Sequence, residues 1–293
     1  MRNPYTGQVL PAARAAKLVR FVKSEVRRMG GRAFPGSHPV SLTRENVQLL
    51  EKEAYYVCEK TDGVRFLLVA CGRLGCFFLG RKGDVRWVKL ALPKRLPKGP
   101  LPPNWQRSDC LLDGELMGTT FYIFDAIFVD QFVGNLPLPE RLRLVQTEVI
   151  IPRMRFQVDD FAVKLKRMYE ASATRFVVEQ VLPKIDNDGL IFTPVHRPYR
   201  PGTDYRLLKW KPPELNSVDF FCKDGKLLCA GGEEVGDLDA ADGIVECVMK
   251  GTWTLLRRRT DKLTANSFRV YKNILKCIQE PVSLEHLYVV SRS

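Results

Sequence analysis

The sequence predicts a two-domain α+β protein, with antiparallel sheets in a large N-terminal domain and a small β-barrel at the C-terminus. Three observations lead to this prediction. The chain has 293 residues, which is more than a single hydrophobic core usually organises. Residues 54–91 form a series of apolar, strand-like segments separated by turns. A Pro-Pro pair at 212 and 213 then separates the first region from a second set of short strands.

The composition limits the classes of partner. Hydrophobic residues make up 45% of the chain, enough for a sizeable core, and the formal net charge is +13. A strongly basic balance favours polyanionic partners such as nucleic acid, nucleotides or an anionic membrane surface, although a generally basic protein has the same balance. Arginines 65, 73 and 81 interrupt the longest apolar runs, so no membrane span is expected.

The eight cysteines predict neither a metal site nor a disulfide framework. They never form a C-x-x-C pair, and several stand inside apolar runs such as "LLVACGRLGCFF". We expect them to be reduced core residues in a reducing compartment.

The elements of the large domain follow from periodicity. Helical spacing over residues 15–29 predicts an amphipathic surface helix, and further helices are predicted at 138–149 and 161–181. Turn residues such as Asp62-Gly63 separate the strands of a mostly antiparallel meander. The predicted strands are 55–60, 64–72, 74–80, 85–92, 109–117, 119–130, 189–194 and 205–211.

Beyond the Pro-Pro pair, short strands are predicted at 216–223, 226–233, 243–250 and 252–260, followed by a helix at 266–279. Several short strands and one helix in so few residues are typical of a small barrel of the oligonucleotide-binding (OB) kind. The predicted domains are therefore 1–212 and 213–293, with a C-terminal tail that can pack back on the first domain.

The segment "EKTDGVRF" places Lys60 at the end of a strand, beside a tight Asp-Gly turn. A lysine held in a cleft becomes a nucleophile when burial and neighbouring cations favour its neutral form. Amines of this kind form covalent intermediates, and an α-phosphorus is a suitable electrophile when cationic groups neutralise its charge. Taken alone, the segment favours the simpler interpretation, a charged hairpin end.

Similar combinations recur along the chain. Acid-glycine pairs appear in "LLDGELM" and "NDGLIF", each at the end of an apolar strand, and Asp125 follows the aromatic run "FYIF". "LLKWKP" and "RRRTDK" place lysines and arginines on later strands. Carboxylates from separate strand ends can hold a divalent cation or a ribose hydroxyl, while basic side chains bind phosphates.

In this order, "EKTDGVR", "DGEL", "FYIFDA", "DGLIF", "LLKWKP" and "RRRTDK" resemble the nucleotidyltransferase motifs of eukaryotic and viral mRNA capping enzymes, the RNA guanylyltransferases. "FPGSHPVSL" is similar to their N-terminal segment, and the resemblance spans about residues 34–280. It implies an α+β nucleotidyltransferase domain, of the ATP-grasp-like ligase and capping type, followed by an OB-fold domain.

The same superfamily contains ATP-dependent DNA and RNA ligases. Asp188 in "DGLIF", the "LLKWKP" context and the R-x-R-x-D-K pattern that begins at Arg257 favour capping over ligation. Two departures are Ala265, where these enzymes often have proline, and "LGRKGD", which leaves Arg81 without the acidic neighbour that is often present.

The resemblance implies a role for each matching residue. Lys60 corresponds to the catalytic nucleophile that receives GMP. Arg65 and Glu115 resemble the ribose contacts, with Arg81 also in the nucleotide site. Phe124 corresponds to the aromatic that stacks on guanine, although a core position fits it as well. Lys166 matches a contact to guanine O6, or a solvated lysine on a helix.

The remaining matches concern phosphates and metal. Asp188 resembles a metal ligand, and Lys209 and Lys211 resemble the α-phosphate contacts. The basic residues that would contact the β- and γ-phosphates are Arg257, Arg259 and Lys262, and Asp261 belongs to the same nucleotide-binding motif. Asp62, Asp113 and Asp125 fit structural turn or network roles equally well, and the three histidines, at positions 38, 196 and 286, are expected to be non-catalytic.

The implied reaction has two steps. Lys60 attacks the α-phosphorus of GTP with Mg²⁺ or Mn²⁺ as cofactor, and GMP then passes to the 5′-diphosphate end of RNA to give a GpppN cap. The implied partners are RNA, an RNA triphosphatase and a cap methyltransferase on separate chains, and the phosphorylated tail of RNA polymerase II. The implied location is the nucleus, with no membrane association. The alternatives are an ATP-dependent polynucleotide ligase and a non-enzymatic module that binds RNA or docks on a polymerase.

Overall fold

The computed structural model describes residues 8–11, 13, 16, 20, 22, 34–72, 75–94, 108–154, 162–260 and 262–292. The predicted helix at 15–29 lies mostly outside these residues; Val22, which is described, is buried. No helix in the described part of the chain is long and apolar enough to cross a membrane.

The first sheet has eight strands in the order β1-β6-β5-β4-β7-β8-β10, with β9 paired to β8. Apart from the parallel pair β8 and β10, its neighbours are antiparallel. This confirms the predicted meander from residue 64 onward, but the predicted strand at 55–60 does not join it, because it pairs in the second sheet. The strands are β1 (Gln8–Val9), β4 (Val64–Cys71), β5 (Gly75–Gly80), β6 (Val85–Val88), β7 (Cys110–Met117), β8 (Thr120–Val129), β9 (Gln131–Phe132) and β10 (Ala162–Leu165).

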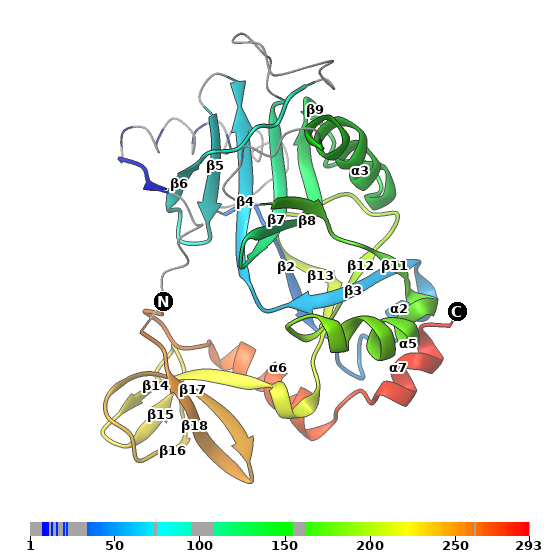
Figure 1. The fold of residues 1–293 in the computed structure, drawn as a ribbon. Helices are drawn as coiled ribbons and strands as arrows, with labels where there is room; N and C mark the ends of the chain where they lie inside the picture. The colour runs from blue at the N-terminus through cyan, green and yellow to red at the C-terminus, as the bar shows by residue number, and fades with distance from the viewer. Residues whose placement is uncertain are drawn as a thin grey trace.

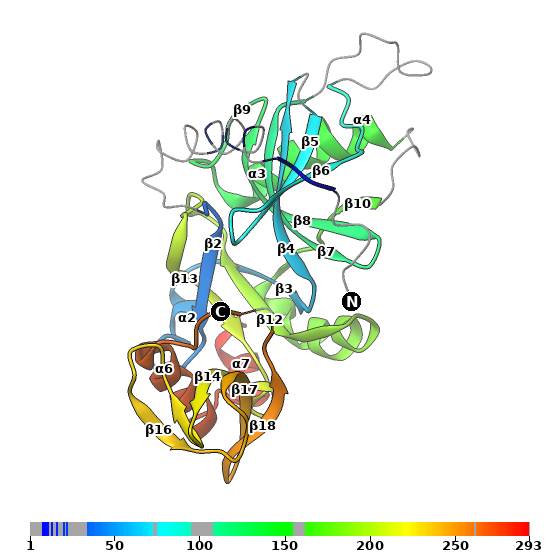
Figure 2. The same cartoon turned by 90° about the vertical axis from the view of Figure 1, so that its left-hand side faces the viewer.

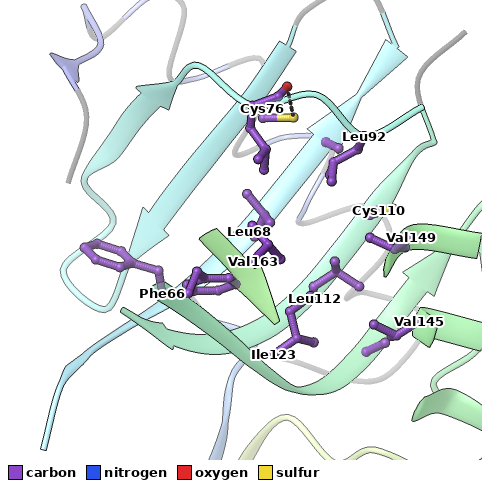
Figure 3. Close-up of a cluster of buried hydrophobic side chains, with 14 of the residues drawn as sticks. Phe66, Leu68, Cys76, Leu92, Cys110, Leu112, Ile123, Val145, Val149 and Val163 are labelled. Carbon is purple, nitrogen blue, oxygen red and sulfur yellow. Dashed lines mark hydrogen bonds between the residues drawn. The ribbon is translucent and has the colours of Figure 1, made fainter. Parts of the chain in front are cut away.

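One face of this sheet is covered by a continuous helical segment, formed by α3 (Leu138–Val145), η3 (Gln146–Ile150) and α4 (Ile151–Arg153). Figure 3 shows Leu112 and Ile123 of the sheet in one apolar cluster with Val145 and Val149 of this segment. All four side chains are fully buried, so the cluster fixes the strands that contribute the site.

The second sheet has five strands in the order β11-β3-β12-β13-β2 and lies beneath the first in Figure 1. Its strands are β2 (Ser37–Ser41), β3 (Tyr55–Thr61), β11 (Tyr169–Glu170), β12 (Asn187–Pro194) and β13 (Gly202–Trp210). Short helices accompany it: α2 (Leu49–Lys52), η4 (Ala171–Ala173), α5 (Thr174–Phe176), η5 (Val177–Val181) and η6 (Leu182–Lys184). The chain passes directly from β3 in this sheet to β4 in the first sheet, so Lys60 lies where the two sheets meet.

The predicted helix at 161–181 is only partly correct. Residues 162–165 form β10, which pairs in parallel with β8, and the helical segments begin at Ala171. The alternation of "AVKL" is a strand pattern, and the free edge of β8 provides its partner. Lys166 is therefore not a solvated helical lysine, because it directly follows a strand and is 5% exposed.

The small domain contains three of the short strands close to their predicted positions, at 217–223, 243–250 and 252–258. The strand predicted at 226–233 ends at Leu228, and the strand Glu234–Asp237 was not predicted. A five-stranded antiparallel sheet has the order β16-β15-β14-β17-β18, and Trp253 of β18 lies beside Gly236 of β16. No backbone ladder between β16 and β18 occurs in the described residues. The elements are η7 (Pro213–Leu215), β14 (Ser217–Lys223), β15 (Lys226–Leu228), β16 (Glu234–Asp237), β17 (Gly243–Lys250), β18 (Thr252–Arg258), α6 (Phe268–Gln279) and α7 (Leu284–Val290).

After the small domain the chain returns to the large one. Figures 1 and 2 show α6 at the junction and α7 beside the helices of the large domain. Val282, Leu287 and Val290 belong to the same apolar cluster as Leu50 and Val57. The Trp210 indole N–H donates to Val282 O at 2.9 Å. The last helix is therefore part of the core of the large domain.

All eight cysteines are free, and seven are buried. This confirms the prediction that they are thiols of the core. Cys76 is an example, since its thiol donates to Leu90 O at 3.5 Å within the apolar cluster of Figure 3.

Candidate active site

A cavity of about 900 Å³, open to solvent, lies between the two sheets of the large domain. It brings together residues that are up to 170 positions apart in the sequence, from Ser37 to Leu207. The predicted site residues on its wall are Lys60, Arg65, Arg81, Glu115, Phe124 and Lys166. Lys209 and Lys211 line a neighbouring cavity of about 520 Å³ at the junction with the small domain.

Lys60 reaches this cavity because β3 ends in a tight turn at Asp62-Gly63. A Cβ at Gly63 would lie 2.7 Å from Leu116 O and 2.8 Å from Glu115 Cγ. Only glycine permits this close approach of the turn to β7. The turn thus holds Lys60 next to the "DGEL" strand.

Asp188 links the predicted nucleophile to a predicted phosphate contact. Lys60 Nζ lies 2.5 Å from Asp188 Oδ1, and Lys211 pairs with the other carboxylate oxygen. Burial alone would raise the pKa of Asp188, but Lys60 and Lys211 together hold it below its ordinary value. Asp188 is therefore ionised at neutral pH and sits between two ammonium groups.

Gly189 explains how Asp188 reaches this position. Its φ is +136°, and a Cβ there would lie 2.0 Å from Trp210 O. The register of β12 against β3 shifts between Asn187 and Leu190. This bulge turns the Asp188 side chain toward Lys60 instead of continuing the regular alternation.

Lys209 lies beside the same group of charges. Burial lowers its pKa to about 8, with further lowering from Lys211 and Lys60. An anion bound between these lysines would relieve the repulsion. The arrangement therefore favours a phosphate group near Lys209.

Arg65 and Glu115 are held by different partners. Arg65 makes a bidentate ion pair with Asp113, with Nε to Oδ1 at 2.9 Å and Nη2 to Oδ2 at 2.5 Å. Glu115 accepts hydrogen bonds from the Thr61 hydroxyl and, at 3.3 Å, from the Gly63 N–H. Asp113 is thus part of the site network.

The deep end of the cavity holds a second buried cation. Lys166 Nζ donates to Thr61 Oγ1 at 3.0 Å and lies 3.5 Å from Glu59 Oε1. Elsewhere on the cavity wall, the Arg65 guanidinium carbon lies 5.3 Å from the centre of the Phe124 ring. A planar group entering the cavity would meet an aromatic face and an ammonium group.

Asp125 lines the cavity but is held in a separate ion pair, whereas the small-domain cations do not line it. Asp125 makes a bidentate ion pair with Arg141, at 2.7 and 2.9 Å, which is a structural role. In the small domain, Arg257 Nε lies 2.7 Å from Glu246, Arg259 lies 2.9 Å from Asp219 and 3.3 Å from Glu246, and Lys262 also pairs with Asp219. Asp261 lies outside the described residues.

Sequence reasoning missed two features of this site. Tyr199 is buried on the cavity wall and contacts Asp113, although it stands in a segment that looks like a plain loop. His38 was set aside, yet burial, Arg65 and Arg81 lower its pKa to about 4, so it is a neutral neighbour of these arginines. Neither position has a spacing signal that could have shown this.

Comparison with known families gives matches to both domains. The family described as "mRNA capping enzyme, catalytic domain" matches residues 7–213, and "mRNA capping enzyme, C-terminal domain" matches residues 229–288.

Individual relatives agree with the family matches. The mRNA-capping enzyme subunit alpha of Schizosaccharomyces pombe is 29% identical and covers 92% of this chain and 83% of its own length. The corresponding subunit of Neurospora crassa is 33% identical, covering 74% of this chain and 61% of its own length. The mRNA-capping enzyme of Danio rerio is 32% identical over 87% of this chain, which spans about half (49%) of that protein.

Among solved structures, the ATP-dependent DNA ligase from bacteriophage T7 in complex with ATP has a TM-score of 0.42 at 14% identity. The likeness covers 75% of this chain and 80% of the ligase. The catalytic-domain match includes every large-domain residue of the cavity described above. The chain therefore belongs to the mRNA capping enzyme family.

Proposed function

We propose that this chain transfers GMP from GTP to the 5′-diphosphate end of RNA through a covalent GMP adduct on Lys60. The observation that carries the proposal is the position of Lys60 on the cavity wall, paired with Asp188, which also pairs with Lys211. Family membership supports the same reaction, because the matched catalytic domain contains all three residues.

In the first step, Lys60 Nζ forms a bond to the α-phosphorus as the bond to the β-phosphate oxygen breaks and pyrophosphate leaves. The Lys60 ammonium must first lose a proton. Asp188 is a poor acceptor for it, since the lysines hold the pKa of this carboxyl low. Asp188 therefore orients Lys60, and the proton passes to solvent or to an oxygen of the leaving group.

The cationic side chains stabilise the charge that develops on the phosphates. Lys209 lies on β13, the strand paired with that of Asp188, and Lys211 directly follows the end of β13; both line the cavity at the junction between the domains. Preorganised charges aimed at the reacting phosphate lower the barrier most when they need no rearrangement during the reaction. A phosphate beside Lys209 would raise the lowered pKa of this lysine, because the anion stabilises the charged ammonium. The same attraction would contribute to the binding free energy of GTP.

A divalent cation fits this site in a limited way. Asp188 offers one ionised carboxylate beside the phosphate position, and the described residues contain no cluster of three metal-ligating side chains. Magnesium is often held by one or two carboxylates together with substrate phosphates. Asp188 would hold Mg²⁺ or Mn²⁺ only together with GTP, where the metal would shield the phosphate charge.

The rest of the nucleotide would occupy the cavity between the sheets. We assign Arg65, Arg81 and Glu115 to the ribose side, Phe124 to the guanine face and Lys166 to the base edge. Glu59 and Thr61 hold Lys166 at the deep end, so a carbonyl oxygen of the base can receive a hydrogen bond there. Adenine has an amino group at that edge, which favours GTP over ATP.

In the second step, the β-phosphate of the RNA end attacks the adduct and releases Lys60. The net charge of +13 supports an RNA substrate bound through its phosphates. We further propose a nuclear location and association with the phosphorylated tail of RNA polymerase II.

The test is incubation with labelled GTP or labelled ATP and a divalent metal, followed by denaturing electrophoresis and mapping of the adduct by mass spectrometry. We expect one GMP on Lys60 and no labelling of Lys60→Arg, which keeps the charge. Label from ATP alone would indicate the ligase reaction, and GMP on another residue would refute the assignment of Lys60.

A further inference from the structure

Tyr199 is a buried tyrosine in the loop between β12 and β13, and its hydroxyl is fully used. It donates to Asp113 Oδ2 at 2.6 Å and accepts from the Ser37 N–H at 2.9 Å. The ring is 5% exposed and packs with Leu67 and Leu111 of the first sheet. Burial raises the pKa of Tyr199 well above its ordinary value, so the hydroxyl remains a donor at every working pH.

Asp113 connects this hydroxyl to the nucleotide cavity. Its side chain is 1% exposed, and that of its partner Arg65 is 8% exposed. Burial alone would lower the pKa of Arg65, but Asp113 more than compensates and keeps the guanidinium charged. The bidentate pairing fixes the plane of the guanidinium group.

That plane matters because Arg65 lies close to two aromatic rings, of which Phe124 lines the cavity. Its guanidinium carbon is 5.3 Å from the centre of the Phe124 ring and 5.9 Å from that of Phe34. A rotation of the Asp113 carboxylate would rotate Arg65 with it. Arg65 donates two hydrogen bonds to the Asp113 carboxylate, and Tyr199 donates a third. Tyr199 lies in the loop between β12 and β13, whereas Arg65 and Asp113 both lie in the first sheet.

We propose that Tyr199 is a positioning residue for the reaction: through Asp113 it holds Arg65 in the orientation that receives the sugar of the nucleotide. This inference rests on the proposed function, which places GTP in the cavity. The chain of donors runs from Ser37 through Tyr199 to Asp113, and Arg65 meets Asp113 from the other side. Ser37 and Tyr199 both line the cavity, so one network ties the N-terminal "FPGSHPVSL" segment to the sugar site.

The test is Tyr199→Phe, which keeps the packed ring and removes only the hydroxyl. We expect the KM for GTP in adduct formation to rise roughly tenfold, the effect of losing about one hydrogen bond to a charged group, with a much smaller change in kcat. The preference for GTP over 2′,3′-dideoxyGTP should shrink in the same variant, because Arg65 would no longer be held against the sugar hydroxyls.

Tyr55→Phe is the matched control. Tyr55 is 3% exposed and donates to Arg206 O at 2.9 Å. It loses a buried hydroxyl in the same way, but that hydroxyl bonds to Arg206 of the second sheet and not to Asp113 or Arg65. We expect both variants to lower the melting temperature and only Tyr199→Phe to raise the KM for GTP.

A double-mutant cycle with Arg65→Ala separates positioning from general destabilisation. If Tyr199 acts through Arg65, adding Tyr199→Phe to Arg65→Ala changes the KM no further. Equal effects of Tyr199→Phe in both backgrounds, or an unchanged KM with lowered stability, would overturn the proposal.

The same cycle is measured on GTP affinity by titration calorimetry without metal. A wild-type chain that binds GTP but forms no adduct would refute the proposed function, while the affinity cycle would still decide the role of Tyr199. A wild-type chain that binds no GTP would overturn both.

Discussion

Replacing Asp188 with asparagine tests the centre of the proposed mechanism, because it keeps the shape of the side chain and removes its charge. In the free protein this carboxylate pairs with Lys60 and Lys211, and all three side chains are only 22–24% exposed. Each charge-assisted hydrogen bond contributes about 1.5–3 kcal/mol when buried. Because the lysines can turn to solvent, we expect a net loss of about 1–2 kcal/mol in the free energy of unfolding.

The expected effect on catalysis is much larger. Without the carboxylate, the site loses the ligand for the metal and the group that orients Lys60. Removing one preorganised group that stabilises developing charge typically costs about 10²–10³ in rate. We therefore expect Asp188→Asn to fold and to form the GMP adduct at least about 100-fold more slowly.

The assay is the initial rate of labelling from GTP, with melting temperature measured on the same samples. Asp186→Asn is the matched control, since it removes the same charge two residues away from an exposed position. We expect it to label at close to the wild-type rate. Near-normal labelling by folded Asp188→Asn would refute the placement of the metal, and faster labelling would show that Asp188 mainly restrains Lys60.

Three further predictions concern pH and the small domain. GTP affinity should fall as pH rises through about 8, where Lys209 loses its proton, and Lys209→Arg should remove this fall in a calorimetric pH series. Arg259→Ala should abolish GMP addition even without RNA, because domain closure must bring this cation to the departing pyrophosphate; an adduct formed at the wild-type rate with only transfer lost would contradict closure. The pKa of His38 is near 6.5 in the unfolded chain and about 4 in the folded chain. Between these values the unfolded chain binds one more proton, so the free energy of unfolding decreases as the pH is lowered. The free energy of unfolding measured with urea should be roughly 1–2 kcal/mol lower at pH 5 than at pH 7. His38→Gln should remove most of that difference.

The strands of the large domain could be predicted because their signals are local. Continuous apolar runs and the Asp62-Gly63 turn define β3 and β4 without any knowledge of the rest of the chain. The segment at 161–181 failed for the opposite reason. Whether residues 162–165 join a sheet depends on the free edge of β8, some 40 positions earlier in the sequence.

The same contrast between local signals and contacts distant in sequence applies to the site. The motifs indicated which residues gather around the cavity, and the structure places Lys60 and Arg65 on its wall. The partners of those residues could not be predicted. Tyr199 and Asp113 are 86 positions apart, and nothing in "HRPYRPG" distinguishes a buried donor from an exposed loop tyrosine. The pairing of Arg259 with Asp219 likewise depends on the orientation of the small domain's strands.

The return of the chain to the large domain restricts how the small domain can move. The polypeptide leaves the large domain at Pro212-Pro213 and comes back at Val282, where the Trp210 indole anchors it. A body attached at two points keeps rotation about the line that joins them and loses most twisting and translation. We expect closure to follow a single arc, so that Arg259 and Lys262 arrive at the nucleotide in one fixed orientation each time. Substitutions at Val282 would then disturb the direction of closure while leaving every residue of the cavity in place.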